Sequence, residues 1–455
     1  MNWLKNKNKK HVLLISPHPK DVIISNDAVF PFPFLSLSLI AAEIPSRYSI
    51  QIMDERISRV HGRERADIVF ITSLTANVDR AYELAGMFEN RGIPVVLGGV
   101  HVSILPEEAS RYATSVVVGE AEGLMETLLS DFEAGQMKPV YKNASQVDLD
   151  SIPFPQLQLL NWRHRFFMSP IQTGRGCTYN CDFCLVPKIS DRKLRLKSFE
   201  TVEKELKHLS RFRTRRLFVA DDNFLMKKER ALTLMNLFKK YGYKWMGFSN
   251  LSVSEDDHFL KKLQDSGCIS LFIGFESLND ESVFLKNRSY TSKDAMRRAV
   301  SNIHEYNIGI QGSFIFGFDT DTVDVFQETV SFIQETGIEL PHISILTPFP
   351  GSPLFEKMEK ENRIIHKDWS MYDMSHTVFQ PKNMSSEELQ QGYAWALKYL
   401  ASPTSIFSRL GHRPGFSFHF LVSNFSLHRS QTRLAHSLWN PAVHHSMQER
   451  HLCLC

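Results

Sequence analysis

Short apolar runs of the kind that form buried strands alternate with helix-forming segments along most of this chain. In residues 1–135 the pattern predicts strands at 11–15, 49–54, 66–72, 94–99 and 115–120, with helices at 34–42, 78–90, 106–112 and 121–133. Such alternation predicts a parallel sheet with helices on both faces, because parallel strands need crossover connections. The fold class is therefore α/β, and residues 1–135 are expected to form a doubly wound, Rossmann-like domain.

A second series of strands and helices follows a proline-rich interruption. Residues 136–165 contain Pro139, Pro153 and Pro155, which break the periodicity and predict a linker. Beyond it we predict strands at 166–171, 216–223, 244–253, 270–277, 309–319 and 341–348, with helices at 199–210, 227–241, 255–266, 291–306 and 322–336. Six such units predict a partial (βα)6 TIM barrel over residues 166–365, open on one side, and a helical C-terminal extension over 366–455.

The residues at the carboxyl ends of the predicted strands are candidate site residues, because parallel sheets and barrels bind ligands at those ends. In the first domain these residues are Ser73, Thr75, Gly98, Gly99, His101, Gly119 and Glu120. In the barrel they are Asp221, Asp222, Asn223, Asn250, Glu276, Ser277 and Asp319. The structural alternative is that the paired aspartates cap helices and that Gly274 and Gly317 are packing glycines.

Three cysteines lie close together in the segment TGRGCTYNCDFCLVP, residues 173–187. Cys177, Cys181 and Cys184 are spaced Cys-x3-Cys-x2-Cys on a glycine-bearing loop, and thiolates suit zinc or iron–sulfur clusters. A closed zinc site needs four ligands, and no fourth Cys or His lies nearby. An incomplete zinc knuckle and a disulfide-linked loop are the alternatives. A cubane held by three cysteines leaves one iron open for a small molecule.

This motif, with the aromatic Phe183 before its third cysteine, resembles the signature of the radical SAM (S-adenosylmethionine) superfamily. The resemblance implies that Cys177, Cys181 and Cys184 bind a [4Fe-4S] cluster whose open iron takes SAM for cleavage to a 5'-deoxyadenosyl radical. GFES (274–277) then places Glu276 and Ser277 at the SAM ribose. ADDNF (220–224) places Asp221 or Asp222 at its amino group, and GSFIFGFD (312–319), which includes Gly317, lies with Phe183 against its adenine.

The first domain resembles the cobalamin-binding domain that precedes one radical SAM subclass. GGVHVSILPEEA and VVVGEAEGLMETLL carry this resemblance, which implies that Ser73, Thr75, Gly98, Gly99, His101, Gly119 and Glu120 surround cobalamin. The Asp-x-His-x-x-Gly element that supplies a lower cobalt ligand elsewhere is absent, and residues 16–21 occupy its loop in another order. We therefore interpret His18 and His101 as ordinary loop residues. A vestigial domain without cobalamin is the alternative.

Composition excludes several classes of protein. A formal charge of +3 over 455 residues does not indicate a nucleic-acid partner. Six cysteines do not make a secreted disulfide scaffold. The early lysines are followed by an apolar run too short for a signal peptide, and no uninterrupted apolar stretch is long enough for a bilayer. A cytoplasmic location is expected, since a reducing compartment suits free thiols and an oxygen-sensitive cluster.

The C-terminal extension contains no Asp or Glu from Leu389 to Gln448, but is basic and rich in Phe. Such a segment could touch an anionic membrane surface or hold an apolar substrate. The alternative, which we favour, is a helical cap packed on the barrel, with Cys453 and Cys455 as free tail thiols. Cys268, which precedes a predicted strand, is expected in the core.

The resemblance implies an enzyme, a cobalamin-dependent radical SAM methyltransferase that methylates an unactivated carbon. DDNF and SFIFGFD are similar to a branch that includes hopanoid methylases, which makes a lipid a candidate substrate. The expected partners are a small-molecule or lipid substrate and an external electron donor of the flavodoxin or ferredoxin type. The alternatives are a radical SAM cyclase or rearrangement enzyme without methyl transfer, and a non-catalytic cobalamin or iron–sulfur sensor.

Overall fold

The computed structural model describes residues 9–18, 35–165, 168–279, 292–411 and 418–439. These residues form two compact units. The first runs as far as Met168 and also includes Leu196–Thr214, and the second contains Ser169–Arg195 and the residues from Arg215 onward. The predicted domain boundaries at residues 135, 165 and 365 remain predictions.

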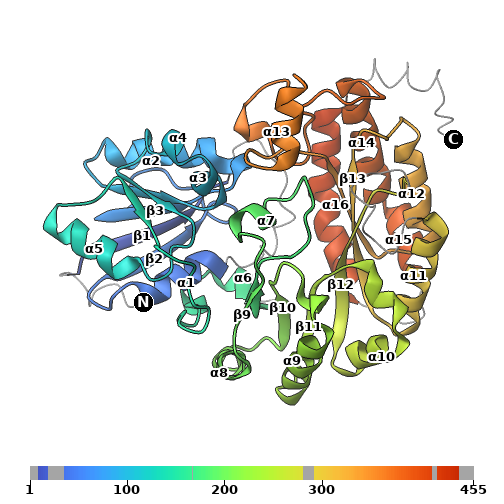
Figure 1. Cartoon of the computed structure of the whole chain (residues 1–455), viewed down its shortest axis with the longest axis horizontal. Coiled ribbons are helices and arrows are strands. Elements are labelled where there is room, and N and C mark those ends of the chain that lie inside the picture. Colours follow the sequence, from blue (N-terminus) through green and yellow to red (C-terminus); the bar gives the residue numbers. More distant parts are fainter. Residues whose placement is uncertain (1–8, 19–34, 166–167, 280–291, 412–417, 440–455) are drawn as a thin grey trace. The chain divides into compact units, whose positions relative to one another are not determined.

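The first unit is built on a parallel sheet of six strands in the order β2-β1-β3-β4-β5-β6 (Figure 1). The strands are β1 (His11–Ser16), β2 (Ser49–Asp54), β3 (Ile68–Thr72), β4 (Val95–Gly98), β5 (Ser115–Val118) and β6 (Val140–Lys142). Strand order reverses between β1 and β3, so the sheet is doubly wound, as predicted. Most of β1 is buried, which explains its nearly continuous apolar sequence HVLLIS.

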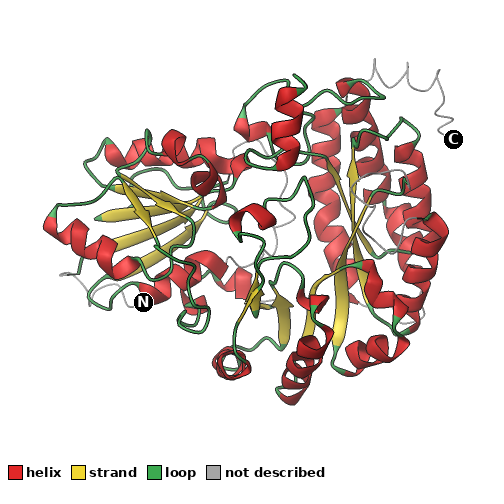
Figure 2. Cartoon of the chain, viewed as in Figure 1, coloured by secondary structure: helices red, strands yellow, loops and turns green. Residues whose placement is uncertain are grey.

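Helices cover both faces of this sheet (Figure 2). They are α1 (Leu35–Glu43), α2 (Val78–Glu89), α3 (Val100–Ile104), α4 (Pro106–Ala109) and α5 (Met125–Ala134), with α6 (Trp162–Arg165) and α8 (Phe199–Leu209) also in this unit. The sequence prediction missed β6 and α3. Strand β6 is a three-residue edge strand in the predicted linker, too short for a periodic pattern. Helix α3 begins directly after Gly99, a residue with no side chain to cap the helix, so the sequence carries no N-cap pattern that would predict its start.

The second unit contains a parallel sheet of six strands in sequential order, β7-β10-β11-β12-β13-β14. They are β7 (Ser169–Ile171), β10 (Arg216–Val219), β11 (Lys244–Ser249), β12 (Cys268–Glu276), β13 (Gly309–Phe316) and β14 (Leu340–Ile345). Helices α9 (Lys228–Lys240), α10 (Asp257–Asp265), α11 (Lys293–Glu305) and α12 (Val325–Thr336) connect them. Within the described residues β7 and β14 do not pair, so the winding is that of a partial barrel left open.

The two faces of this second sheet differ in burial. One face packs against the helices: the rings of Phe275 and Phe314 stack with centroids 4.9 Å apart and both meet Phe332 of α12. The alternate residues of β12, β13 and β14, among them Phe272 and Ser313, remain partly accessible. We call this second side the lumen face. It carries the candidate site.

The C-terminal residues form a helical cap on the barrel, as favoured from the sequence. Its helices are α13 (Pro353–Lys360), α14 (Ser386–Ala401), α15 (Pro403–Gly411) and α16 (Phe418–Leu438). Earlier in the chain, the cysteine loop and the residues after it form the short elements β8 (Gly174–Arg175), α7 (Val186–Ile189) and β9 (Arg195–Leu196). Leu340 of β14 shares a buried cluster with Ile406, Leu410, Phe420 and Leu427. Cys453 and Cys455 lie outside the described residues, and none of the helices in the described ranges is long and apolar enough to cross a membrane.

Candidate functional site

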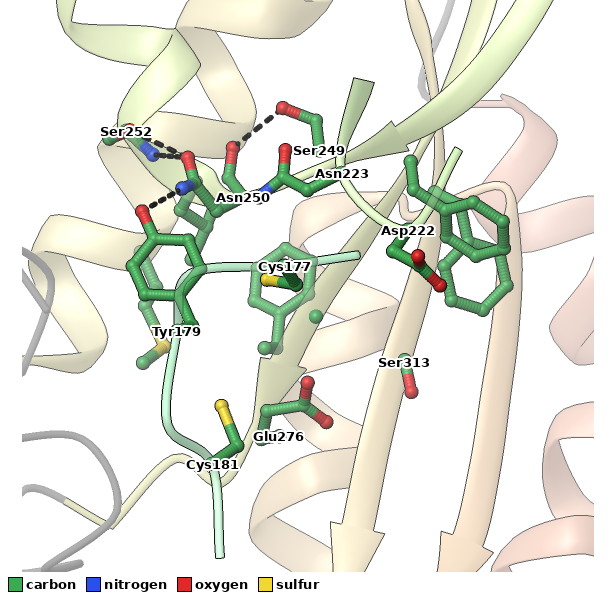
Figure 3. A pocket seen from close by; sticks show the side chains of 16 residues that line it. Cys177, Tyr179, Cys181, Asp222, Asn223, Ser249, Asn250, Ser252, Glu276 and Ser313 are labelled. Atoms are coloured by element: carbon green, nitrogen blue, oxygen red, sulfur yellow. Dashed lines mark hydrogen bonds between the residues drawn. The ribbon is translucent and has the colours of Figure 1, made fainter. Parts of the chain in front are cut away.

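A cavity of about 260 Å³ opens on the lumen face of the second unit, beside the cysteine loop. Figure 3 shows the side chains that surround it. Its lining comes from the loop, from β11, β12 and β13, from the residues that follow β10 and β11, and from one residue of α11: Cys177, Tyr179, Cys181, Asp222, Asn223, Phe248, Ser249, Asn250, Leu251, Ser252, Phe272, Gly274, Phe275, Glu276, Met296 and Ser313. Two of the three predicted cysteines, Cys177 and Cys181, therefore meet several predicted strand-end residues in one place, while Cys184 lines a neighbouring pocket together with Cys181.

The cysteine loop carries free thiols on Cys177, Cys181 and Cys184, so the disulfide alternative is wrong. Gly176 lets the loop take this path: its φ is +96°, and an added Cβ would lie 2.0 Å from the carbonyl oxygen of Lys193. Burial, together with the nearby Cys181 and Cys177, raises the pKa of Cys184 to about 11. The gathered thiols thus favour a cationic group that would stabilise the thiolate form.

The donor set fits an iron–sulfur cluster better than one zinc ion. Structural zinc needs four converging ligands. In the described part of the chain, no three His, Cys, Asp or Glu side chains form a site for a single metal ion. Three thiols on one loop, next to an accessible cavity, match a cluster with one position left for a small molecule.

Two neighbouring carboxylates tie the cysteine loop to β10. The buried Asp221 accepts hydrogen bonds from the backbone N–H of Thr173 at 2.6 Å and from its hydroxyl at 2.5 Å. Asp222 accepts one from the backbone N–H of Gly176 at 2.7 Å and lines the cavity. Asp221 is therefore occupied in holding the loop, while Asp222 is available to a ligand.

Glu276 reaches the cavity through an unusual backbone conformation. Its φ is +63°, and the register of β12 against β13 shifts between Gly274 and Glu276. The Glu276 carboxylate folds back over Gly274, where an added Cβ would lie 2.2 Å from Oε1. Gly274 is thus needed for the position of Glu276, a closer role than the packing alternative that its sequence suggested.

Sequence reasoning missed Tyr179, Ser252 and Ser313. The Tyr179 hydroxyl accepts a hydrogen bond from Asn250 Nδ2 at 2.7 Å, which joins the cysteine loop to the end of β11. Ser313 lies on the lumen face of β13, level with Gly274. Tyr179 could have been found by its position between two cysteines. Ser313 carries no such signal, because its role depends on strand register.

Several predicted barrel residues do not line this cavity. The Ser277 hydroxyl is buried and accepts a hydrogen bond from the backbone N–H of Asn279. Gly317 has a φ of +103°, and an added Cβ would meet Leu389 of α14 at 2.8 Å. Phe183 packs edge-on against Phe318. Asp319 pairs with Arg363, Lys357 and Lys382, so that, although burial opposes its ionisation, its pKa falls to about 2.

The strand ends of the first unit form a second candidate edge. Gly98 has open space around it, since an added Cβ would make only an ordinary 3.8 Å contact with Val117. Gly119 is equally open, with a φ of +83°. Gly99 differs: its φ is +107°, and an added Cβ would lie 2.3 Å from the carbonyl oxygen of Ser73. Gly99 is therefore required by the fold itself.

Other predicted residues of this edge are engaged within the unit. His101 is fully buried, and its ring nitrogens lie 3.2 Å from the Thr75 hydroxyl and 3.3 Å from Glu108. Glu120 accepts a hydrogen bond from the backbone N–H of Val147. The sequence predicts His101 to be an ordinary loop residue; it lies instead in helix α3, where these contacts engage its ring within the unit.

Comparisons with known proteins match the two units separately, except that the radical SAM match also includes Leu196–Thr214 of the first unit. Residues 171–333 match the Radical SAM superfamily, residues 39–129 match the B12 binding domain, and residues 352–414 match a domain of unknown function, DUF4070. The radical SAM match thus spans both the cysteine loop and the lined strand ends. The B12 match runs from within α1 to within α5, so it includes β2, β3, β4 and β5 of the doubly wound sheet but not β1 or β6.

Proteins with similar sequences or folds include several named methyltransferases. Bacteriochlorophyllide d C-12(1)-methyltransferase of Chlorobaculum tepidum is 31% identical over 93% of this chain and 94% of its own length. Hopanoid C-2 methylase of Rhodopseudomonas palustris is 25% identical over 76% and 68%. Among solved structures, the radical S-adenosylmethionine methyltransferase TsrM of Kitasatospora setae shares the fold, with a TM-score of 0.64, 15% identity and 94% and 99% coverage.

The two matched domains indicate which cofactors the protein uses. The radical SAM domain uses a [4Fe-4S] cluster and SAM, and the B12 binding domain uses cobalamin. Radical SAM enzymes typically also need a small-molecule substrate and a reductant that supplies electrons to the cluster. The 31% identity over nearly the whole of both chains shows that this protein is an enzyme belonging to the cobalamin-dependent radical SAM methyltransferases.

Proposed function

We propose that the protein methylates an unactivated carbon of a magnesium tetrapyrrole. Relatives named as bacteriochlorophyllide d methyltransferases are 31% and 28% identical to it, and one named as an anaerobic magnesium-protoporphyrin IX monomethyl ester cyclase is 22% identical. The observation that carries the proposal is the cavity, where the cluster thiols stand beside the aromatic side chains of Phe248 and Phe272. Flat conjugated rings pack well on such surfaces.

The chain's own residues would bind and orient the reactants. Bound together, the cluster and SAM supply a radical that removes hydrogen from carbon, and cobalamin supplies the methyl group. We assign Cys177, Cys181 and Cys184 as cluster ligands. Asp222 would pair with the SAM amino group, and Glu276 would accept hydrogen bonds from its ribose hydroxyls. Asp221 would hold the cysteine loop in place through its hydrogen bonds with Thr173.

Removal of the Glu276 carboxylate should weaken SAM binding while leaving the iron content unchanged. We expect Glu276→Ala to lower SAM affinity by about ten- to a hundredfold, since a hydrogen bond to a charged group contributes roughly 1.5–3 kcal/mol. Gly274→Ala should produce much of the same loss, because its Cβ would occupy the position of Glu276 Oε1. Calorimetric titration of the reconstituted protein measures both.

A double-mutant cycle makes this test sharper. Because both changes remove one carboxylate from one place, the double variant should bind SAM no more weakly than Glu276→Ala. Ser277→Ala is the matched control, since that hydroxyl is turned away from the cavity and bonded to Asn279. Additive losses, or equal losses in the control, would remove Glu276 from the SAM site.

Cobalamin should be excluded by a side chain at Gly98. We propose that cobalamin lies over the carboxyl ends of β3, β4 and β5, where Gly98 and Gly119 leave space. Gly98→Val fits the backbone, and should lower cobalamin affinity at least about tenfold without changing the iron content. Gly86→Val on α2 is the matched control, since it also has open space. Binding is followed by cobalamin absorbance after gel filtration.

The outcome separates two accounts of the first unit. If wild type takes up no cobalamin under reducing conditions, the domain is vestigial. If wild type and Gly98→Val take up equal amounts, cobalamin lies elsewhere in the protein. Gly99→Val would not separate these accounts, since its side chain would displace the backbone of Ser73.

A polycyclic lipid is the second candidate substrate, because one relative is a hopanoid methylase. Phe407 and Phe425, exposed on the helical cap with ring centroids 5.9 Å apart, favour contact with an apolar phase such as a membrane surface. The electron donor in either case would be a cytoplasmic flavodoxin or ferredoxin.

The substrate proposal is tested by supplying each acceptor separately. The reconstituted enzyme is given SAM with a labelled methyl group, a chemical reductant and either magnesium protoporphyrin IX, a bacteriochlorophyllide or a hopanoid. Label in a tetrapyrrole supports the proposal. Label in the hopanoid alone overturns it, and a tetrapyrrole changed without gaining label indicates the cyclase alternative.

A further inference from the structure

His342 lies on β14, on the lumen face and level with the cavity. In the sheet register it is the partner of Ser313, which in turn is the partner of Gly274, and both of those residues line the cavity. Gly274 has no side chain and that of Ser313 is small, so the larger polar groups near this level are the Glu276 carboxylate, which folds back over Gly274, and the imidazole of His342. Of these two groups, the imidazole of His342 is the nitrogen base.

The imidazole lacks the hydrogen bond that a buried polar group normally has. Its Nε2 atom is enclosed and has no partner in the described part of the chain, while the residue as a whole remains partly accessible. An unsatisfied buried polar atom costs about 1–3 kcal/mol. Burial also lowers the pKa of His342 to about 4, so the ring is neutral at physiological pH and keeps a lone pair for a ligand.

An aromatic row leads to His342 across the lumen face. Phe218 of β10 lies 5.5 Å from Phe248 of β11, which lies 4.8 Å from Phe272 of β12, and the ring of Phe272 lies 5.0 Å from that of His342. All distances join ring centroids. This row offers a broad apolar wall with a single nitrogen base at one end, a combination that suits a flat apolar molecule with a Lewis-acidic centre.

We propose that His342 binds the substrate as an axial ligand to the central Mg²⁺ of a tetrapyrrole whose face lies against this aromatic row. The proposal rests on the proposed function. The four ring nitrogens of a tetrapyrrole occupy one plane around the metal and leave its axial positions open. Neutral imidazole is a common metal ligand, and a substrate metal would supply the partner that His342 lacks.

The test compares a metal-bearing with a metal-free ligand. The full reconstituted chain is titrated with magnesium protoporphyrin IX and with metal-free protoporphyrin IX, by fluorescence quenching and by the absorption spectrum. We expect wild type to prefer the magnesium form at least about tenfold. His342→Phe keeps the aromatic packing but has no nitrogen, so it should lose this preference and the spectral change that axial ligation causes.

Two controls keep the result interpretable. His258→Phe, at an exposed position on α10, should behave as wild type. His342→Gly should regain the spectral change when free imidazole is added, which a purely structural histidine would not show. Iron content and thermal melting check that the variants fold.

Two results would overturn the proposal, and they are distinguishable. If His342→Phe keeps the wild-type preference for the magnesium form, the ligand assignment is wrong while the tetrapyrrole substrate stands. If the wild type binds neither porphyrin, the proposed function fails and the assignment fails with it.

Discussion

Replacing Cys177, Cys181 and Cys184 together by alanine should abolish the iron–sulfur cluster and all SAM cleavage. The three free thiols belong to one loop beside the cavity, and Cys268, the remaining described cysteine, is buried in β12 with its thiol directed to the carbonyl of Ser270. No other described thiol can replace them. Wild type reconstituted anaerobically should hold about four irons per chain with broad visible absorption. The triple variant should hold none.

Cys268→Ala is the matched control, since it removes one cysteine without touching the loop. It should retain the iron and the spectrum of wild type. Iron and sulfide analysis with the visible spectrum measures both variants. A triple variant with the iron content and spectrum of wild type would show that the cluster is held elsewhere.

Asp221→Ala should release the cysteine loop although it removes no proposed ligand. The change leaves the backbone N–H of Thr173 and Gly174 and the Thr173 hydroxyl without their acceptor in a buried place. Each unpaired buried group costs about 1–3 kcal/mol, and the sum approaches the whole stability of an ordinary domain. We expect a lower melting temperature and a cluster that is lost on gel filtration.

The control for this variant is Asp265→Ala, which removes an exposed carboxylate paired with Lys261 on α10. Such a surface pair contributes little, so melting and cluster retention should match wild type. Asp221→Asn should be intermediate, since its amide oxygen can still accept from one donor. Wild-type cluster retention in Asp221→Ala would mean that the loop is positioned by other contacts.

Apart from β6, the strands of both sheets were predictable because each is a short apolar run between polar turns. The order and register of these strands within the sheets were less predictable. The doubly wound class follows from alternation, but the short edge strand β6 leaves no periodic signal in its three residues. The register that brings Gly274, Ser313 and His342 to one level depends on pairing between segments far apart in the chain.

The candidate site was predictable where a residue's type and position carry its chemistry. Cys177 and Cys181 meet in the cavity, as do Asp222, which follows β10, and Glu276, the last residue of β12. Asp221 looks the same in sequence as Asp222, but only the folded loop directs it to Thr173. The positive φ of Glu276 and its dependence on Gly274 likewise appear only in three dimensions.

The central claim is that this protein couples radical cleavage of SAM to methyl transfer. One anaerobic reaction tests it most directly, with reconstituted enzyme, cobalamin, reductant, a magnesium tetrapyrrole and SAM carrying a labelled methyl group. We predict that wild type forms 5'-deoxyadenosine and a labelled methylated product together, and that the triple cysteine variant forms neither. Labelled product without 5'-deoxyadenosine, or from the triple variant, would contradict the account.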